Sequence, residues 1–150
     1  MTETRVRLSD LMGGDHHDLD ERWERFQNTP ASDRTRRRTI FDSFRADLLH
    51  HIAIEEEELF PRILSADPAQ RGLVGRLLDE HRQIKEALDR LSEGLAAGSG
   101  SIDRLGLELI NVLWEHNARE EASAYPWLDD HLTAPEVLEV RDDLARRRPR

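Results

Sequence analysis

The chain has 150 residues, with 22 lysines and arginines against 31 aspartates and glutamates, so its formal net charge is −9. This length is typical of one domain, and an acidic chain is a poor candidate for binding the phosphate backbone of DNA or RNA. The absence of cysteine excludes disulfide scaffolds, iron–sulfur clusters and thiolate zinc sites.

Four short turn or capping sequences predict where helices begin and end. The stretch Asn28-Thr29-Pro30-Ala31-Ser32 predicts a turn and the start of a helix, and Asp67-Pro68 places a capping residue before a proline at the first helical position. The glycine-rich residues 98–101 predict a flexible loop, with Ser101 as the cap of the next helix. The stretch Thr133-Ala134-Pro135-Glu136 matches a capping box.

These turn and capping sequences separate four segments of about 20 to 30 residues, each with apolar residues at helical spacing. Four long helices with short loops predict an all-α, up-down-up-down four-helix bundle, followed by a short fifth helix at about 135–146. We expect a single domain over 1–150, with the bundle at about 8–132 and a C-terminal helix and basic tail at 133–150. The apolar stripes include Phe41, Phe44, Leu48, Ile52 and Leu59 in the second segment, and Leu105, Leu109, Val112, Leu113 and Trp114 in the fourth.

The chain also repeats itself at an offset of 65 residues, the interval from His16 to His81. A repeat that preserved packing alone would keep apolar positions and let polar ones drift, whereas this one keeps histidines and glutamates in register. It therefore predicts two helical hairpins related by a pseudo-two-fold axis. The aligned pairs are His16/His81, His51/His116, Glu55/Glu120, Asp15/Glu80, Leu19/Ile84, Phe44/Leu109, Leu48/Leu113, Glu56/Glu121, Phe60/Tyr125 and Pro61/Pro126.

The repeated histidines and glutamates have the spacing of a metal site. In each His-x-x-x-Glu pair the two side chains lie on one helix face about one turn apart, so both can reach one centre. Six such ligands suit two ions, because a carboxylate can bridge two cations and roughly one octahedral position per ion stays open. Imidazole and carboxylate suit iron, zinc, manganese or copper. The predicted metal ligands are His16, His51, Glu55, His81, His116 and Glu120.

Other polar and aromatic residues near this pattern have simpler interpretations. We expect His17 and His50 to be exposed or to support the ligands, and His131 to lie on the surface. Glu56 and Glu121 could bind the ligand histidines, but solvent-facing positions are the preferred interpretation. The basic runs at 34–38 and 146–150 are interpreted as solvated helix ends. Packing in the core is preferred over lining the metal site for Trp23, Phe26, Phe44, Trp114 and Tyr125, although the Tyr125 hydroxyl could donate to a bound ligand.

These motifs resemble the hemerythrin-like, or HHE cation-binding, domains over about residues 8–132. The matching segments are Asp15-His16-His17-Asp18-Leu19-Asp20, His51-Ile52-Ala53-Ile54-Glu55-Glu56 continuing to Leu59-Phe60-Pro61, Asp79-Glu80-His81 with Ile84, and His116-Asn117-Ala118-Arg119-Glu120-Glu121 continuing to Tyr125-Pro126. The resemblance implies a four-helix bundle with a non-haem di-iron centre. It further implies two iron ions per chain, bridged by oxide or hydroxide and by Glu55 and Glu120.

The sequence departs from the oxygen-carrying hemerythrins at two positions. Lys85 stands where those proteins have a second histidine on the third helix, and Glu120 stands where they have an aspartate. The order H, HxxxE, H, HxxxE is more similar to a branch that includes di-iron proteins for the repair of iron centres. That branch also includes mycobacterial hemerythrin-like proteins with catalase-like activity and the iron-sensing hemerythrin domain of an F-box protein.

The resemblance leaves several functions open. We expect a protein that binds O2, NO or peroxide for sensing or for protection against oxidative and nitrosative stress. The alternatives are a di-iron enzyme, catalase-like or for iron-centre repair, an iron-binding or iron-sensing module, and a metal-free helical interaction protein. No apolar run approaches the roughly 20 residues that span a bilayer, and residues 1–5 do not resemble a signal peptide. We therefore expect a cytoplasmic protein without membrane or nucleic-acid partners, and its fifth helix could form a homodimer.

Overall fold

The computed structural model describes residues 5–146, and helices make up most of that range. Over the described residues no strand is present, which confirms the all-α prediction, while the predicted tail at 147–150 lies outside this range. No described helix is both long enough and apolar enough to cross a lipid bilayer. The elements are α1 (Leu8–Asn28), α2 (Arg34–Ile54), η1 (Glu55–Leu59), α3 (Phe60–Ala66), η2 (Pro68–Gln70), α4 (Arg71–Ala97), α5 (Ile102–Arg119), η3 (Glu120–Ala124), α6 (Tyr125–His131) and α7 (Ala134–Arg146).

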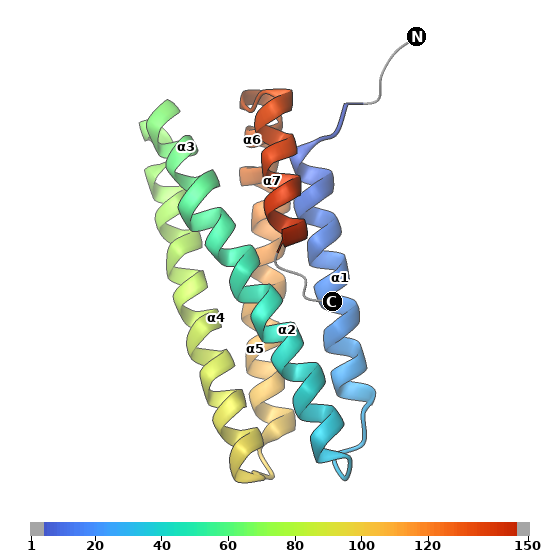
Figure 1. The fold of residues 1–150 in the computed structure, drawn as a ribbon. Helices are drawn as coiled ribbons and strands as arrows, with labels where there is room; N and C mark the ends of the chain where they lie inside the picture. Colours follow the sequence, from blue (N-terminus) through green and yellow to red (C-terminus); the bar gives the residue numbers. More distant parts are fainter. Residues whose placement is uncertain (1–4, 147–150) are drawn as a thin grey trace.

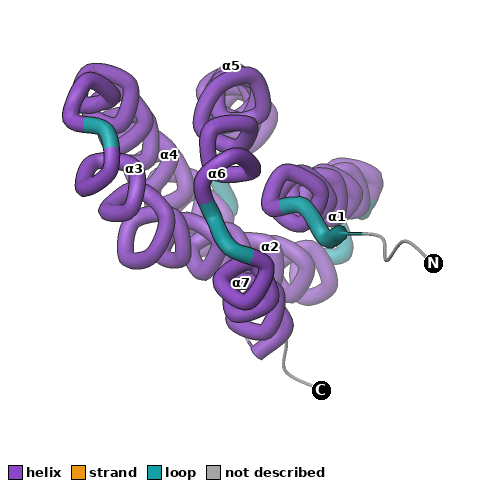
Figure 2. Tube along the Cα trace, turned by 90° about the horizontal axis from the view of Figure 1, so that it is seen from above, coloured by secondary structure: helices purple, strands orange, loops and turns teal. Residues whose placement is uncertain are grey.

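The helices form four long columns and a short fifth helix. The elements α2, η1 and α3 follow one another without a break, as do α5, η3 and α6. Figure 1 shows each column running in the opposite direction to the one before it, with α7 folding back beside the upper half of the bundle. Seen from above in Figure 2, α7 lies outside the columns and next to α2, and it contacts both α2 and α1.

Three of the predicted capping residues precede a helical segment, including Asp67, whose Oδ1 accepts the Ala69 N–H at 3.2 Å. The capping box is confirmed, because Thr133 N–H donates to Glu136 Oε1 at 2.8 Å and Glu136 N–H donates to Thr133 Oγ1 at 3.3 Å. Ser101 is the N-cap residue of α5, as predicted, but its hydroxyl makes no capping hydrogen bond. The Ser99 hydroxyl instead accepts the Ser101 N–H at 3.0 Å. The loop begins at Gly98, whose φ of 65° is readily adopted only by glycine.

Two apolar clusters fill the interior, and a polar layer separates them. Along α1, His16 lies between Met12 in one cluster and Leu19 in the other, and the same holds in every column. The cluster at the α3–α6 end also buries the apolar face of α7. Its residues include Leu8, Met12, Leu59, Phe60, Ile63, Leu77, Tyr125, Leu128, Val137, Val140 and Leu144. The cluster at the loop end includes Leu19, Trp23, Phe26, Phe41, Phe44, Leu48, Ile84, Leu88, Leu91, Leu109 and Leu113.

The predicted apolar stripes are confirmed with one exception. Trp23, Phe26 and Phe44 are buried in the loop-end cluster, as expected. Trp114 was expected to pack in the core, but it is 56% exposed. It follows the buried Leu113 directly, and successive residues on an α-helix point about 100° apart. Trp114 therefore faces solvent while its neighbour faces the core.

Two π-helical turns interrupt the second and fourth columns at equivalent places in the repeat. In each turn a backbone N–H bonds five residues back, from Phe60 to the Glu55 carbonyl and from Tyr125 to the Glu120 carbonyl. The next residue in each case is a proline, which has no N–H and whose ring would clash with the carbonyl four residues earlier in an α-helix. The wider turn removes this clash, so the prolines explain why both π turns form here.

Two glycines test how tightly the columns pack. Gly75 on α4 is exposed, and a methyl added to it would meet no neighbour within 4 Å, whereas a methyl added to Gly106 of α5 would lie 3.1 Å from the Trp23 ring. We expect Gly75→Ala to raise the free energy of unfolding by roughly 0.5–1 kcal/mol, the usual gain from replacing a helical glycine. Gly106→Ala should show no such gain, because the buried Trp23 ring must move. Urea unfolding measures both changes, and an equal gain at both positions would contradict tight packing at Gly106.

Candidate metal centre

The structure brings all six predicted ligand residues to one level of the bundle. The histidines come one each from α1, α2, α4 and α5, while Glu55 and Glu120 open the two π turns. All six are buried, with at most 3% of any residue exposed. They form two groups in which one donor atom per residue lies within 4.8 Å of every other. The groups are His16, His51, Glu55 and Glu120, and Glu55, His81, His116 and Glu120.

The two carboxylates belong to both groups. Glu55 Oε1 lies 3.0 Å from His81 Nε2, and Glu55 Oε2 lies 3.4 Å from His51 Nε2. Each oxygen of Glu55 thus faces a different histidine pair, as a bridging carboxylate must. Glu120 spans the same gap, with distances of 3.3 Å from Oε1 to His16 Nε2 and 3.1 Å from Oε2 to His116 Nε2.

Buried carboxylates orient the histidines of the His-x-x-x-Glu motifs. Asp15 Oδ2 lies 2.7 Å from His51 Nδ1, and Glu80 Oε1 lies 2.9 Å from His116 Nδ1. A carboxylate that accepts a hydrogen bond from Nδ1 leaves Nε2 facing inward and increases its basicity. The repeat aligns Asp15 with Glu80, but the sequence analysis assigned neither a role. Their position directly before a repeated histidine was the signal that could have identified them.

Half-exposed carboxylates orient the other two histidines. Glu121 Oε2 lies 2.7 Å from His16 Nδ1, and Glu56 Oε2 lies 2.8 Å from His81 Nδ1. Both glutamates therefore bond to ligand histidines, which was the alternative to the preferred solvent-facing interpretation, although 29% of the Glu56 side chain and 51% of the Glu121 side chain stay exposed. Each follows a proposed ligand by one residue and points about 100° away from it, toward the histidine of an adjacent column. Lys85, at the position of departure from the oxygen carriers, lies 3.5 Å from Glu56 and not in the donor set.

Tyr125 makes the two halves of the centre unequal. Its buried hydroxyl donates to Glu55 Oε2 at 2.6 Å or Glu120 Oε1 at 2.9 Å, and lies 3.1 Å from His16 Nε2. In an α-helix, residues five apart point about 140° apart, so the π turn is what lets Tyr125 and Glu120 face the same site. The equivalent residue in the other half is Phe60, which only stacks on His81 with ring centroids 5.5 Å apart.

The electrostatics of the site favour positive charge. Burial alone would lower the pKa of His51, but the charge of Glu55 and the hydrogen bonds with Asp15 and Glu55 raise it to about 10. For His81, burial is outweighed by its interactions with the Glu120 and Glu55 carboxylates, and its pKa is also about 10. Burial would raise the pKa of Glu120, yet its histidine partners hold it well below the usual range. Protons, or metal cations in their place, therefore balance the carboxylates of this layer.

The donor set fits a metal ion. Buried polar atoms are rarely left without a partner, yet within residues 5–146 neither His116 Nε2 nor Glu120 Oε2 makes a well-aligned hydrogen bond. They face each other in the polar layer at 3.1 Å. A cation held by both atoms would satisfy them, and imidazole nitrogen with carboxylate oxygen suits iron among other transition metals.

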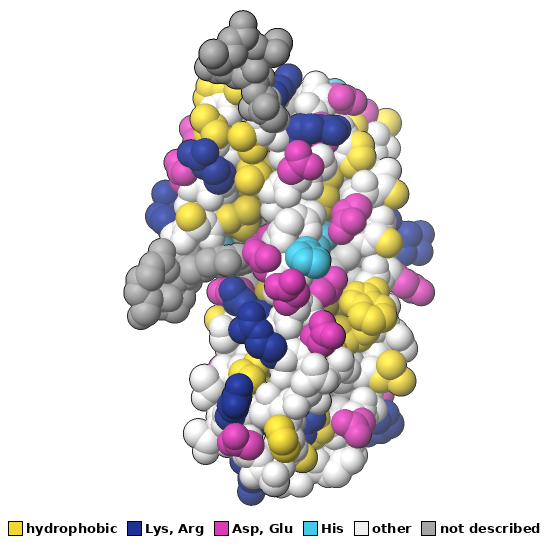
Figure 3. All heavy atoms as spheres, turned by 90° about the vertical axis from the view of Figure 1, so that its right-hand side faces the viewer, with side chains coloured by type: hydrophobic (Ala, Val, Ile, Leu, Met, Phe, Trp, Pro, Cys, Tyr) yellow, Lys and Arg dark blue, Asp and Glu magenta, His cyan; other side chains and the backbone are white. Residues whose placement is uncertain are grey.

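The remaining histidines lie outside the donor set. His17 is exposed and pairs with Glu21 at 3.2 Å, and His131 is exposed and stacks on Trp127, as expected for surface residues. His50 is half-buried, with Nε2 2.9 Å from the Asp143 carbonyl of α7. On the face shown in Figure 3, acidic side chains gather around a histidine near the middle of the molecule.

The orienting carboxylates give a test of the site. We expect Asp15→Ala to weaken metal affinity by about 10–100-fold, the usual effect of removing a group that orients a ligand histidine. Asp10→Ala, which removes the same charge from an exposed position of α1, should leave the affinity unchanged. Anaerobic titration with Fe²⁺ against a coloured chelator measures both. Equal affinities for the two variants would contradict an orienting role for Asp15.

Comparison with known proteins agrees with this geometry. The hemerythrin HHE cation binding domain matches residues 7–128, a range that includes the six donors and the four orienting carboxylates. Searches of curated proteins and of solved structures find no match. Because the family match covers most of the sequence, the chain belongs to the hemerythrin HHE cation-binding domain family.

Proposed function

We propose that this chain is a di-iron protein of the H-HxxxE-H-HxxxE branch that binds O2, NO or peroxide for sensing or for protection against oxidative and nitrosative stress. The observation that carries the proposal is the pair of buried donor groups that share Glu55 and Glu120. Each group offers two imidazoles and two carboxylates, so His16, His51, Glu55, His81, His116 and Glu120 would hold two ions. Bound iron would supply open coordination positions and a reversible change of oxidation state.

The protein's own residues would set the conditions for a small ligand. The two apolar clusters close the layer above and below, which excludes bulk water from the donors. Burial, reinforced by the charges of Glu120 and Glu55, raises the pKa of Tyr125 well above its usual range, so its hydroxyl keeps its proton. That hydroxyl lies beside the His16–His51 pair, where it can donate a hydrogen bond to a bound ligand.

The first experiment measures metal content and ligand response together. We expect two irons per chain after anaerobic loading, with an absorption spectrum that changes on reduction and again on stopped-flow mixing with O2 or NO. Glu55→Ala removes a donor from both groups and should abolish both iron binding and the response. His131→Ala, which alters a surface histidine, should leave both intact. Isolation with zinc, or a failure to bind ferrous iron, would contradict the proposal.

Tyr125 favours a catalase-like enzyme as a second candidate, because it places a proton donor within 3.3 Å of four of the donor residues. The Tyr125→Phe variant has phenylalanine at both equivalent positions of the repeat, 60 and 125. We expect the variant to retain iron but to lose about 100-fold or more in oxygen evolution from added peroxide, the usual range for removing an acid–base group. An oxygen electrode measures the rate, and equal rates for free iron would contradict enzymatic activity.

A further inference from the structure

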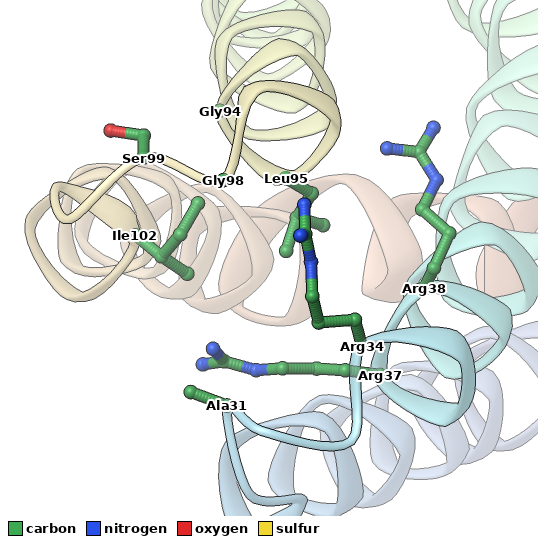
Figure 4. Close-up of a pocket in the computed structure, with 9 residues that line it drawn as sticks. All are labelled: Ala31, Arg34, Arg37, Arg38, Gly94, Leu95, Gly98, Ser99 and Ile102. Carbon is green, nitrogen blue, oxygen red and sulfur yellow. The ribbon is translucent and has the colours of Figure 1, made fainter.

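A second polar site lies at the opposite end of the bundle from α7. The turn between α1 and α2 meets the loop between α4 and α5 there, and a cavity of about 230 Å³ lies between them. Arg34, Arg37 and Arg38 of α2 line it on one side, and Leu95 and Ile102 line it on the other. Figure 4 shows the Arg34 and Arg37 side chains extending into the space between these segments, while Arg38 points toward α4.

The positive charge of this cavity is only partly compensated. No acidic residue lines it. Arg38 is satisfied, because it donates to the Ser92 carbonyl and hydroxyl at 2.8 Å and pairs with Asp42 at 3.1 Å. Within residues 5–146, the side chains of Arg34 and Arg37 make neither a hydrogen bond nor an ion pair, although the Arg37 backbone N–H donates to the Asp33 carbonyl at 3.0 Å. The arginines of this run are therefore more than the solvated helix end that the sequence predicts.

The Arg37 side chain is held in place by an aromatic ring and has a donor that is free to bind a ligand. Its guanidinium lies over the Phe26 ring, 4.7 Å from the centroid, which limits its motion. Its Nε is buried with no hydrogen-bond partner. A buried donor of this kind lowers stability unless a partner satisfies it. The Arg37 side chain lines the cavity, so an anionic group that enters the cavity meets its guanidinium.

The helix ends do not explain the arginines as a stabilising feature. Arg34 and Arg37 lie in the first turn of α2, where the helix dipole disfavours cations, and this turn contains no acidic residue. The C-terminal end of α4 at Gly98 offers partial negative charge to Arg34, which approaches that glycine closely. Arg37 also lines a neighbouring cavity that contains Asp103, but no described residue makes an ion pair with its guanidinium. In a chain with a net charge of −9, this local excess points to an anionic partner.

We propose that this cavity binds the phosphate group of a small molecule. Guanidinium groups match phosphate oxygens through paired charge-assisted hydrogen bonds. The volume is below the roughly 300–1,000 Å³ typical of drug-sized ligands, so a compact organic phosphate fits, with Leu95 and Ile102 against its carbon skeleton. Arg37 and His51 are separated by about 20 Å along the helix axis at 1.5 Å per residue, so the site is distinct from the metal centre.

Calorimetric titration of the iron-loaded protein tests the proposal with three probes. These are inorganic phosphate, glycerol phosphate, and phosphatidylcholine vesicles with and without phosphatidic acid. We expect saturable binding of one glycerol phosphate per chain without a change in the absorption spectrum of the iron centre. Arg37→Gln should weaken binding about tenfold or more, as loss of a charged hydrogen bond does. Arg34→Gln, at an exposed position, should weaken it as well and keeps the test valid if Arg37→Gln fails to fold.

Arg36→Gln is the matched control, because it removes the same charge from an exposed residue of α2 that does not line the cavity. It should bind glycerol phosphate as the unmodified protein does. Three results would overturn the proposal. The first is that neither soluble phosphate binds, and the second is that only phosphatidic acid vesicles bind. The third is that binding changes the iron spectrum while its affinity is unaffected by substitution of Arg34 or Arg37. Because the measurement does not depend on O2, NO or peroxide, its outcome is separate from that of the proposed function.

Discussion

The burial of four imidazoles and two carboxylates in a single layer is the constraint on which the rest of the structure depends. Polar groups lose their hydration when they are buried, and charged groups lose more. The layer is therefore stable only if each donor is oriented and the charges balance. The four orienting carboxylates, Asp15, Glu56, Glu80 and Glu121, meet the first requirement. Cations, as protons or metal ions, meet the second, while the apolar clusters on both sides hold the columns at the required separation.

The internal repeat explains how two halves build one site, and its departures from symmetry explain how they differ. Every hydrogen bond from a ligand histidine to its orienting carboxylate occurs twice, once in each half. Both π turns follow the repeated glutamates and precede the repeated prolines. The pair Phe60 and Tyr125 breaks this symmetry, because only Tyr125 brings a hydroxyl into the donor set. The two halves thus offer the same donors in different surroundings.

The sequence alone predicts the helical fold and the six clustered residues because both signals are repeated. Apolar periodicity fixes which face of each helix is buried, and the aligned His-x-x-x-Glu motifs place donors on that face. The π turns escape prediction, since the helical pattern assumes 3.6 residues per turn throughout. Glu56 and Glu121 were misjudged for a related reason. A residue that points away from its own neighbour can still face another column, and the packing of columns is not visible in a local pattern.

The arginine cavity was missed because it depends on two loops that meet in space. The run at 34–38 looks like a solvated helix end when only α2 is considered. The loop between α4 and α5 lines the same cavity as these arginines, and the Nε of Arg37 is buried. Trp114 illustrates the opposite error, in which an apolar residue at helical spacing was assigned to the core although it lies beside the buried stripe.

The unequal exposure of the four orienting carboxylates divides the imidazoles into two kinds. Asp15 and Glu80 are buried, so the Nδ1 protons of His51 and His116 are insulated from bulk water. Glu56 and Glu121 reach solvent with 29% and 51% of their side chains exposed, and they connect His81 and His16 to it. One imidazole of each pair is therefore bonded to a carboxylate that reaches solvent, while the carboxylate bonded to its partner is largely covered by protein.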